Sequence, residues 1–181
     1  MAMEDLKSRL PEYAKDLKLN LSGLINAPEG MSEQQLWGCL LAAAIASRNE
    51  LVTASILEDA VNHLDEAALT GVKGAAAIMG MNNIYYRFVS MVSDKEYSTM
   101  PAKLRMNVMM NPGVPKVDFE LWALVVSAVN GCQSCVDSHE RVLREKELDR
   151  AAIQHAVRIA AVVHAIAATM DAEQAMTSLP A

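Results

Sequence analysis

The sequence has few aromatic residues, few cysteines and no excess of positive charge. Of its 181 residues 4% are aromatic and three are cysteine, and the formal net charge is -6. Scarce aromatic residues disfavour β-sheets, and three cysteines are too few for the disulfide framework of a secreted protein. The acidic balance argues against the basic patches that bind nucleic acid. We therefore expect a cytoplasmic helical protein without a nucleic-acid partner.

Long uninterrupted hydrophobic runs are also missing. The segment Met1–Leu10 mixes charged with apolar residues, which predicts an amphipathic helix rather than a signal peptide. The most apolar stretch, 151–170, is interrupted by four polar residues that a membrane span tolerates poorly. We expect no transmembrane segment and no membrane partner.

Proline is absent where helices would run, and capping residues mark where they would begin. No proline lies between positions 28 and 101 or between 115 and 180, and proline interrupts helix interiors. Ser32 and Gln35 form a capping box that opens a helix over 33–47. Asp118 is predicted to cap a helix over 119–130, and the other predicted N-caps are Asp65 and Asp149.

The two halves of the chain share sequence. Leu36-Trp37 aligns with Leu121-Trp122 at an offset of 85, and the segment 64–68 aligns with 148–152 at 84. Two copies indicate duplication of one helical unit, since a solenoid needs at least three.

We predict one all-α domain over residues 1–181, a helical bundle of two pseudo-repeated units. The first unit covers about 32–93 and the second about 117–171. The connector, about 94–116, carries the Asn111-Pro112-Gly113 turn signal.

The strongest chemical signal is a CxxC motif, Cys132 and Cys135, with His139 four residues later. If a helix begins near Gln133, the three side chains lie along one face. The helix dipole then lowers the thiol pKa below its ordinary value of about 8.5. This pattern predicts a reactive thiol pair.

Two other interpretations of the motif stay open. Cys132, Cys135 and His139 could be three ligands of a structural zinc ion, although no second motif supplies a fourth. The cysteines could also simply pack. At an offset of 85 the first unit has Ser47, Glu50 and Ala54 at the three positions, and this loss favours chemistry over packing.

Glu120 lies in the first turn of the helix that leads to the motif. A carboxylate there complements the helix dipole. Alternatively, a fold back at Gly131 brings Glu120 near His139, where the pair could exchange protons with the thiols.

Two further sulfur features have weaker implications. Cys39 aligns with Leu124 and is expected to be a buried hydrophobic residue. Methionines cluster at 79, 81, 91, 100, 106, 109 and 110. Thioethers can bind copper, but filling of the core or of a subunit interface is the preferred interpretation.

Together these motifs resemble the AhpD family, the alkyl hydroperoxide reductase D proteins of the carboxymuconolactone-decarboxylase-like superfamily. The resemblance runs from near Leu6 to about Met170. Besides the CxxC with His139, it rests on PEYAKD (11–16), LNL (19–21), QLWG (35–38), AAAIMGMNN (75–83), LRMN (104–107), NPG (111–113) and FELW (119–122).

The resemblance implies a homotrimeric thiol peroxidase with an all-helical fold and no haem, flavin or metal. Its electrons would come from dihydrolipoyl groups on an acyltransferase, and it would reduce hydroperoxides directly or pass electrons to an AhpC-like peroxiredoxin. By position, Cys135 would become the sulfenic acid and Cys132 would resolve it to a redox disulfide. Glu120 and His139 would relay protons.

One residue departs from the family pattern. The family carries a histidine immediately before the second cysteine, where this chain has Ser134. Serine cannot hold a proton near neutral pH, so we expect weaker peroxidase activity. The dipole argument favours Cys132 as the thiol attacked first, whereas the nearby His139 and the resemblance favour Cys135.

Alternative functions follow from the same motif. A general disulfide reductase would use the thiols without peroxide, and an oligomeric adaptor would hold zinc. A decarboxylase, suggested by the superfamily name, has no obvious use for a CxxC.

Overall fold

The computed structural model describes residues 2–178, and all regular structure in that range is helical, as predicted. The elements in chain order are α1 (Ala2–Ser8), η1, a 3-10 turn (Glu12–Ala14), α2 (Lys15–Asn26), α3 (Glu33–Ser47), α4 (Glu50–Ala60), α5 (Glu66–Met91), α6 (Glu96–Thr99), α7 (Asn107–Met110), α8 (Lys116–Val129), α9 (Gln133–Glu145) and α10 (Arg150–Thr177).

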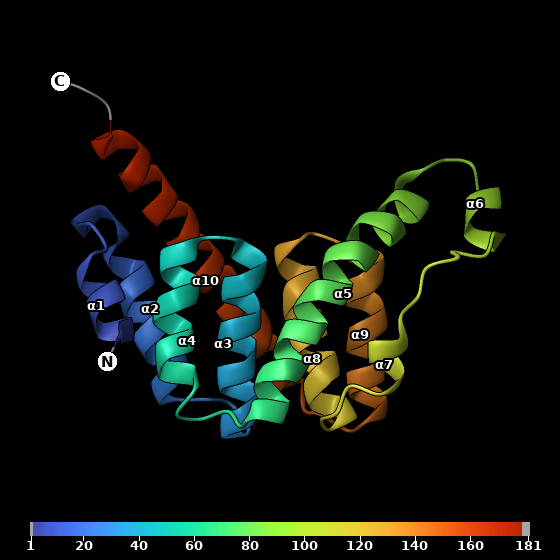
Figure 1. Ribbon diagram of the computed structural model, residues 1–181, viewed down its shortest axis with the longest axis horizontal. Coiled ribbons are helices and arrows are strands. Elements are labelled where there is room, and N and C mark those ends of the chain that lie inside the picture. The colour runs from blue at the N-terminus through green and yellow to red at the C-terminus, as the bar shows by residue number, and fades with distance from the viewer. Residues whose placement is uncertain (1, 179–181) are drawn as a thin grey trace.

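Helices α3 and α8 form the centre of the bundle. They pack against each other, and both contact α5 and α10 (Figure 1). The fully buried Trp122 of α8 lies against Gly38 of α3, where an added Cβ would come within 2.1 Å of the indole nitrogen. Only glycine permits this close approach. Helices α1, α2 and α4 cover one side of this core, and α9 covers α8 and α5.

Most of the predicted helix starts are confirmed. Ser32 and Gln35 form the capping box of α3, and Asp65 and Asp149 accept backbone hydrogen bonds at the starts of α5 and α10. Cys39 is fully buried, as expected.

The predicted role of Asp118 as an N-cap is wrong. Helix α8 begins at Lys116, three residues earlier than expected, after the N-cap Pro115. Proline is compatible with a helix start because its φ is fixed. Asp118 therefore lies inside the first turn, where its carboxylate accepts hydrogen bonds of 2.7 Å from the side chains of Gln34 and Gln35. These bonds join α8 to α3.

The order of helices α3, α4 and α5 recurs in α8, α9 and α10. The starts of α3 and α8, however, lie 83 residues apart rather than 85, and so do the starts of α4 and α9. Asn49, the N-cap of α4, therefore corresponds to Cys132, the N-cap of α9, in place of Ser47. The division of the chain into two units stays a prediction.

Helix α10 is long and apolar enough to cross a membrane by length and composition alone. Of its most apolar window, 56% is buried inside the fold, where α10 packs against α2, α3 and α8. This burial is typical of a core helix in a bundle.

The connector between the units carries the single-turn helices α6 and α7. Together with the end of α5, α6 projects from the bundle at the upper right of Figure 1. The chain then returns, and α7 packs against α5.

Candidate active site

A tight turn places the CxxC motif at the start of a helix, as the sequence predicts. Helix α8 ends at Val129, and Gly131 adopts a φ of 66°, a left-handed conformation that glycine tolerates best. Cys132 is then the N-cap of α9, with extended backbone and no side-chain capping bond. The first backbone N–H groups of α9 are therefore not capped by the side chain of Cys132.

Cys132 and Cys135 are joined by a disulfide, with their Cα atoms 5.3 Å apart. The two sulfurs differ in accessibility, because Cys132 is 0% exposed whereas Cys135 is 6% exposed and lines a cavity. An external reactant thus reaches Cys135 first. The dipole argument that favoured Cys132 takes no account of this burial.

The cavity beside Cys135 has a volume of about 270 Å³. Cys135, His139 and Ser134 of α9 form one wall, and residues of α5 and the connector form the other. Its surface is mostly apolar, and three of the clustered methionines line it: Met79, Met106 and Met109. Met79 is fully buried, as the core interpretation predicts, whereas Met91, Met100 and Met110 are exposed. The sequence did not predict that methionines line the cavity beside Cys135.

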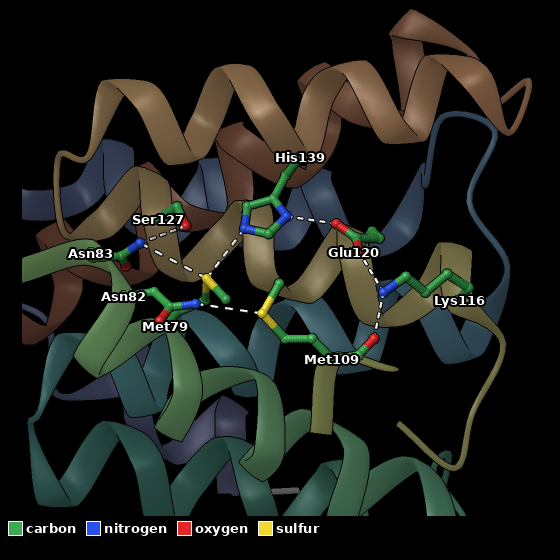
Figure 2. Close-up of polar contacts among 8 residues, drawn as sticks. All are labelled: Met79, Asn82, Asn83, Met109, Lys116, Glu120, Ser127 and His139. Carbon is green, nitrogen blue, oxygen red and sulfur yellow. Dashed lines mark hydrogen bonds and ion pairs between the residues drawn. The ribbon is translucent and has the colours of Figure 1, made fainter. Parts of the chain in front are cut away.

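Glu120 and His139 meet as the fold back at Gly131 predicts. The carboxylate Oε2 lies 2.6 Å from His139 Nδ1, and both side chains are buried (Figure 2). The other oxygen, Oε1, lies 2.9 Å from Lys116 Nζ one turn earlier on α8. Lys116 in turn donates to the carbonyl of Met109 over 2.6 Å.

These contacts decide the ionisation of Glu120. Burial by itself would raise the pKa of the carboxyl, because water no longer solvates the charge. The hydrogen bonds and positive charges of His139 and Lys116 outweigh that effect and hold the pKa of Glu120 below its ordinary value. A carboxylate ionised at neutral pH can orient the imidazole and stabilise its protonated form.

The second nitrogen of His139 does not contact a cysteine. Nε2 lies 3.2 Å from the sulfur of Met79, a weak acceptor. In the disulfide state the imidazole lies in the wall of the cavity that Cys135 also lines.

Ser134, the residue that departs from the family pattern, lies between the two sulfurs and α5. Its hydroxyl is 3.6 Å from the sulfur of Cys132 and donates to the carbonyl of Tyr86 over 3.3 Å. The hydroxyl can stabilise a Cys132 thiolate, but unlike imidazole it cannot carry a proton away.

Cys132, Cys135 and His139 are not arranged to bind zinc in the disulfide state. The two sulfurs are bonded to each other, and both nitrogens of His139 have other partners. Within residues 2–178 no group of three or more His, Cys, Asp or Glu side chains could hold a metal ion.

The chain is similar to known proteins along almost its whole length. Residues 95–178 match the carboxymuconolactone decarboxylase family. The chain is 58% identical over 181 residues to the alkyl hydroperoxide reductase AhpD of Gluconacetobacter diazotrophicus, covering 100% of this chain and 99% of the relative. The AhpD of Maricaulis maris is 56% identical over 173 residues, 96% of this chain and 99% of the relative. The chain belongs to the AhpD family.

Within this AhpD-family site, sequence reasoning missed Lys116, Met79 and Asn82. The spacing of Lys116 and Glu120, four residues apart on a helix, is a signal that could have revealed the first. Met79 and Asn82 come from α5, more than 50 residues before Cys135 in the chain, and no local pattern connects them to the motif.

Proposed function

We propose that this chain is a thiol peroxidase that reduces organic hydroperoxides through a cycle between the Cys132 and Cys135 dithiol and their disulfide. The names of its relatives, alkyl hydroperoxide reductase, support the substrate class. The observation that carries the proposal is the accessible sulfur of Cys135 in a cavity beside the buried pair of Glu120 and His139.

The proposed reaction consumes one hydroperoxide and two thiols. The pair of Glu120 and His139 accepts the Cys135 proton, and the thiolate attacks the terminal peroxide oxygen, which breaks the O–O bond and leaves a sulfenic acid. Cys132 protonates the departing alkoxide. The Cys132 thiolate then forms the disulfide and displaces hydroxide, which regains the first proton as water. The products are an alcohol, water and the disulfide.

Dihydrolipoamide is the proposed reductant. One of its thiolates attacks the Cys135 sulfur, the less buried of the two, and its second thiol displaces the protein by thiol–disulfide exchange. In the cell the donor would be the dihydrolipoyl group of an acyltransferase, and an AhpC-like peroxiredoxin would accept electrons as a further partner. A cytoplasmic location suits this chemistry because the cytoplasm keeps thiols reduced.

A homotrimer is part of the same proposal. Apolar side chains are exposed along the end of α5 and the connector, namely Ile84, Phe88, Met91, Tyr97 and Met100. Exposed apolar patches are typical of contact surfaces, and light scattering of the purified protein measures the subunit number directly.

The test is NADH consumption with tert-butyl hydroperoxide, lipoamide, lipoamide dehydrogenase and this protein, each omitted in turn. We expect turnover that needs every component and that disappears in Cys135→Ser. Turnover that persists in Cys135→Ser would contradict the proposal.

A second candidate, a disulfide reductase without peroxidase activity, is favoured by Ser134 and by the absence of a contact between His139 and either sulfur in the described residues. It predicts that the disulfide cycles with lipoamide while hydroperoxide is not consumed.

A further inference from the structure

The wall of the cavity opposite Cys135 carries a polar group of its own, the amide of Asn82. Asn82 lies on α5 and is 3% exposed. Its backbone carbonyl oxygen is 4.0 Å from the Cys135 sulfur. Met79, whose sulfur contacts His139, lies one turn earlier on the same helix face. The same face of α5 therefore borders both the reacting sulfur and the imidazole.

The hydrogen-bonding capacity of this amide is poorly used. Its nitrogen donates only to thioethers, over 3.3 Å to Met106 and 3.4 Å to Met109 (Figure 2 shows the bond to Met109). Its oxygen is buried and has no hydrogen-bond partner among the described residues. Thioether sulfur is a weak acceptor, and a buried amide oxygen without a donor is uncommon and needs an explanation.

The chemistry of the cavity matches an organic hydroperoxide. Such a molecule has one O–H donor, two acceptor oxygens and an apolar group. The amide of Asn82 offers one acceptor and a donor, and the thioether side chains of Met106 and Met109 offer an apolar, deformable surface.

We propose that Asn82 binds the hydroperoxide and that Met106 and Met109 hold its organic group. This inference rests on the proposed peroxidase function. The side-chain amide turns away from the thioethers, so that its oxygen, buried in this state, enters the cavity and accepts from the peroxide O–H while its N–H donates to the oxygen that bears the organic group. That oxygen becomes the alkoxide when Cys135 attacks its neighbour, so the N–H bond strengthens as negative charge develops. The apolar wall makes organic hydroperoxides better substrates than hydrogen peroxide.

The test is a single-turnover measurement on the pre-reduced dithiol protein. Wild type and Asn82→Leu are mixed with cumene hydroperoxide or hydrogen peroxide, and the rate of disulfide formation is recorded. Leucine keeps the volume and removes both hydrogen bonds. We expect the rate to fall at least about tenfold for both peroxides. Reduction of the disulfide by dihydrolipoamide should stay within about twofold, because it does not use the amide. Asn82→Ala carries the same expectation if the leucine variant does not fold.

A matched control separates binding from a structural role. Val108 of α7 packs beside Gly74 of α5 and does not line the cavity, so Val108→Ala loosens the contact between α7 and α5 without changing the proposed binding groups. If Asn82 binds peroxide, Val108→Ala reacts at the wild-type rate. If Asn82 only holds α7 in place, Val108→Ala loses activity as Asn82→Leu does, and the inference is overturned.

A third variant tests the apolar wall. Met109→Ser should lower the ratio of the cumene hydroperoxide rate to the hydrogen peroxide rate, and an unchanged ratio would overturn that part of the inference. A wild-type dithiol that reacts with neither peroxide would refute the peroxidase function itself. A normal rate in Asn82→Leu would refute only the role of Asn82.

Discussion

Helix α4 of the first unit begins at a capping asparagine, whereas helix α9 of the second begins at a cysteine. The Asn49 oxygen accepts a 2.8 Å bond from the Val52 amide, and its nitrogen donates to Asp171. Cys132, at the same place in the second unit, makes no capping bond. The start of α9 thus lacks the stabilising contact that α4 has, at the point where the sulfurs are placed.

The buried faces of α4 and α9 also differ. In α4, Val52 and Ile56 face the core and are almost completely buried. The corresponding positions of α9 are Cys135 and His139. These two packing positions hold aliphatic side chains in α4 and reactive ones in α9. This comparison indicates that the scaffold can be built without the reactive set.

The largest expected effect is on proton transfer. Glu120→Gln keeps the shape of the side chain but removes the charge that orients His139. We expect peroxidase turnover to fall by about 10² or more, the range for loss of acid–base catalysis. A turnover within twofold of wild type would contradict the relay.

The same variant has a pH signature in stability. Because the pKa of Glu120 is lowered by folding, its stabilising contribution is full above the unfolded value and is lost as pH falls through the folded value. The difference in melting temperature between wild type and Glu120→Gln should therefore be largest near neutral pH and shrink below about pH 4. Thermal unfolding followed by circular dichroism from pH 7 to pH 3 measures it.

A smaller effect is expected at the family departure. Ser134→His restores an imidazole beside the sulfur of Cys132, 3.6 Å from the present hydroxyl. We expect hydroperoxide turnover to rise about tenfold, since a second imidazole can move protons near neutral pH. An unchanged rate in the NADH-coupled assay would contradict this prediction, because it would show that Ser134 does not limit hydroperoxide turnover.

The two caps give a direct comparison of stability. Both Asn49→Ala and Asn49→Ser lose the bond to Asp171, but only the alanine variant also loses the N-cap, so it should be less stable than the serine variant by about 1 kcal/mol. In the reduced protein, Cys132→Ser should leave the free energy of unfolding unchanged or raise it by up to about 1 kcal/mol, because serine can cap α9. Urea unfolding with a reductant present tests all three. A large loss in Cys132→Ser would mean that the cysteine is needed for packing.

The smallest effect concerns the turns before the caps. Arg48 and Gly131 both have positive φ, 63° and 66°. Gly131→Ala meets no neighbour within 4 Å, so only the backbone penalty of about 1 kcal/mol remains. Arg48→Gly should change stability by less than about 0.5 kcal/mol, since relief of strain is offset by the entropy of glycine. Thermal unfolding of both variants checks the contrast.

Local signals predicted much of this molecule, because helices start and stop for local reasons. The capping box at Ser32, the caps at Asp65 and Asp149 and the start of α9 near Gln133 all follow from neighbours within a few residues. The prediction for Asp118 failed because α8 already begins after Pro115 and because Gln34 and Gln35 donate to the Asp118 carboxylate.

The site was only partly predictable. The meeting of Glu120 and His139 follows from one turn at Gly131. The contact of His139 with Met79, and the position of Asn82, depend on how α5 packs across α9. Such contacts between distant segments leave no trace in sequence spacing.

The most direct test of the account is to trap the sulfenic acid. The reduced variants Cys132→Ser and Cys135→Ser are each treated with one equivalent of cumene hydroperoxide and a sulfenic-acid-specific carbon nucleophile, and the labelled peptide is identified by mass spectrometry. The account predicts label on Cys135 in the first variant and none in the second. Label on Cys132 in the second variant, with none in the first, would contradict the assignment of the accessible sulfur as the one that peroxide attacks.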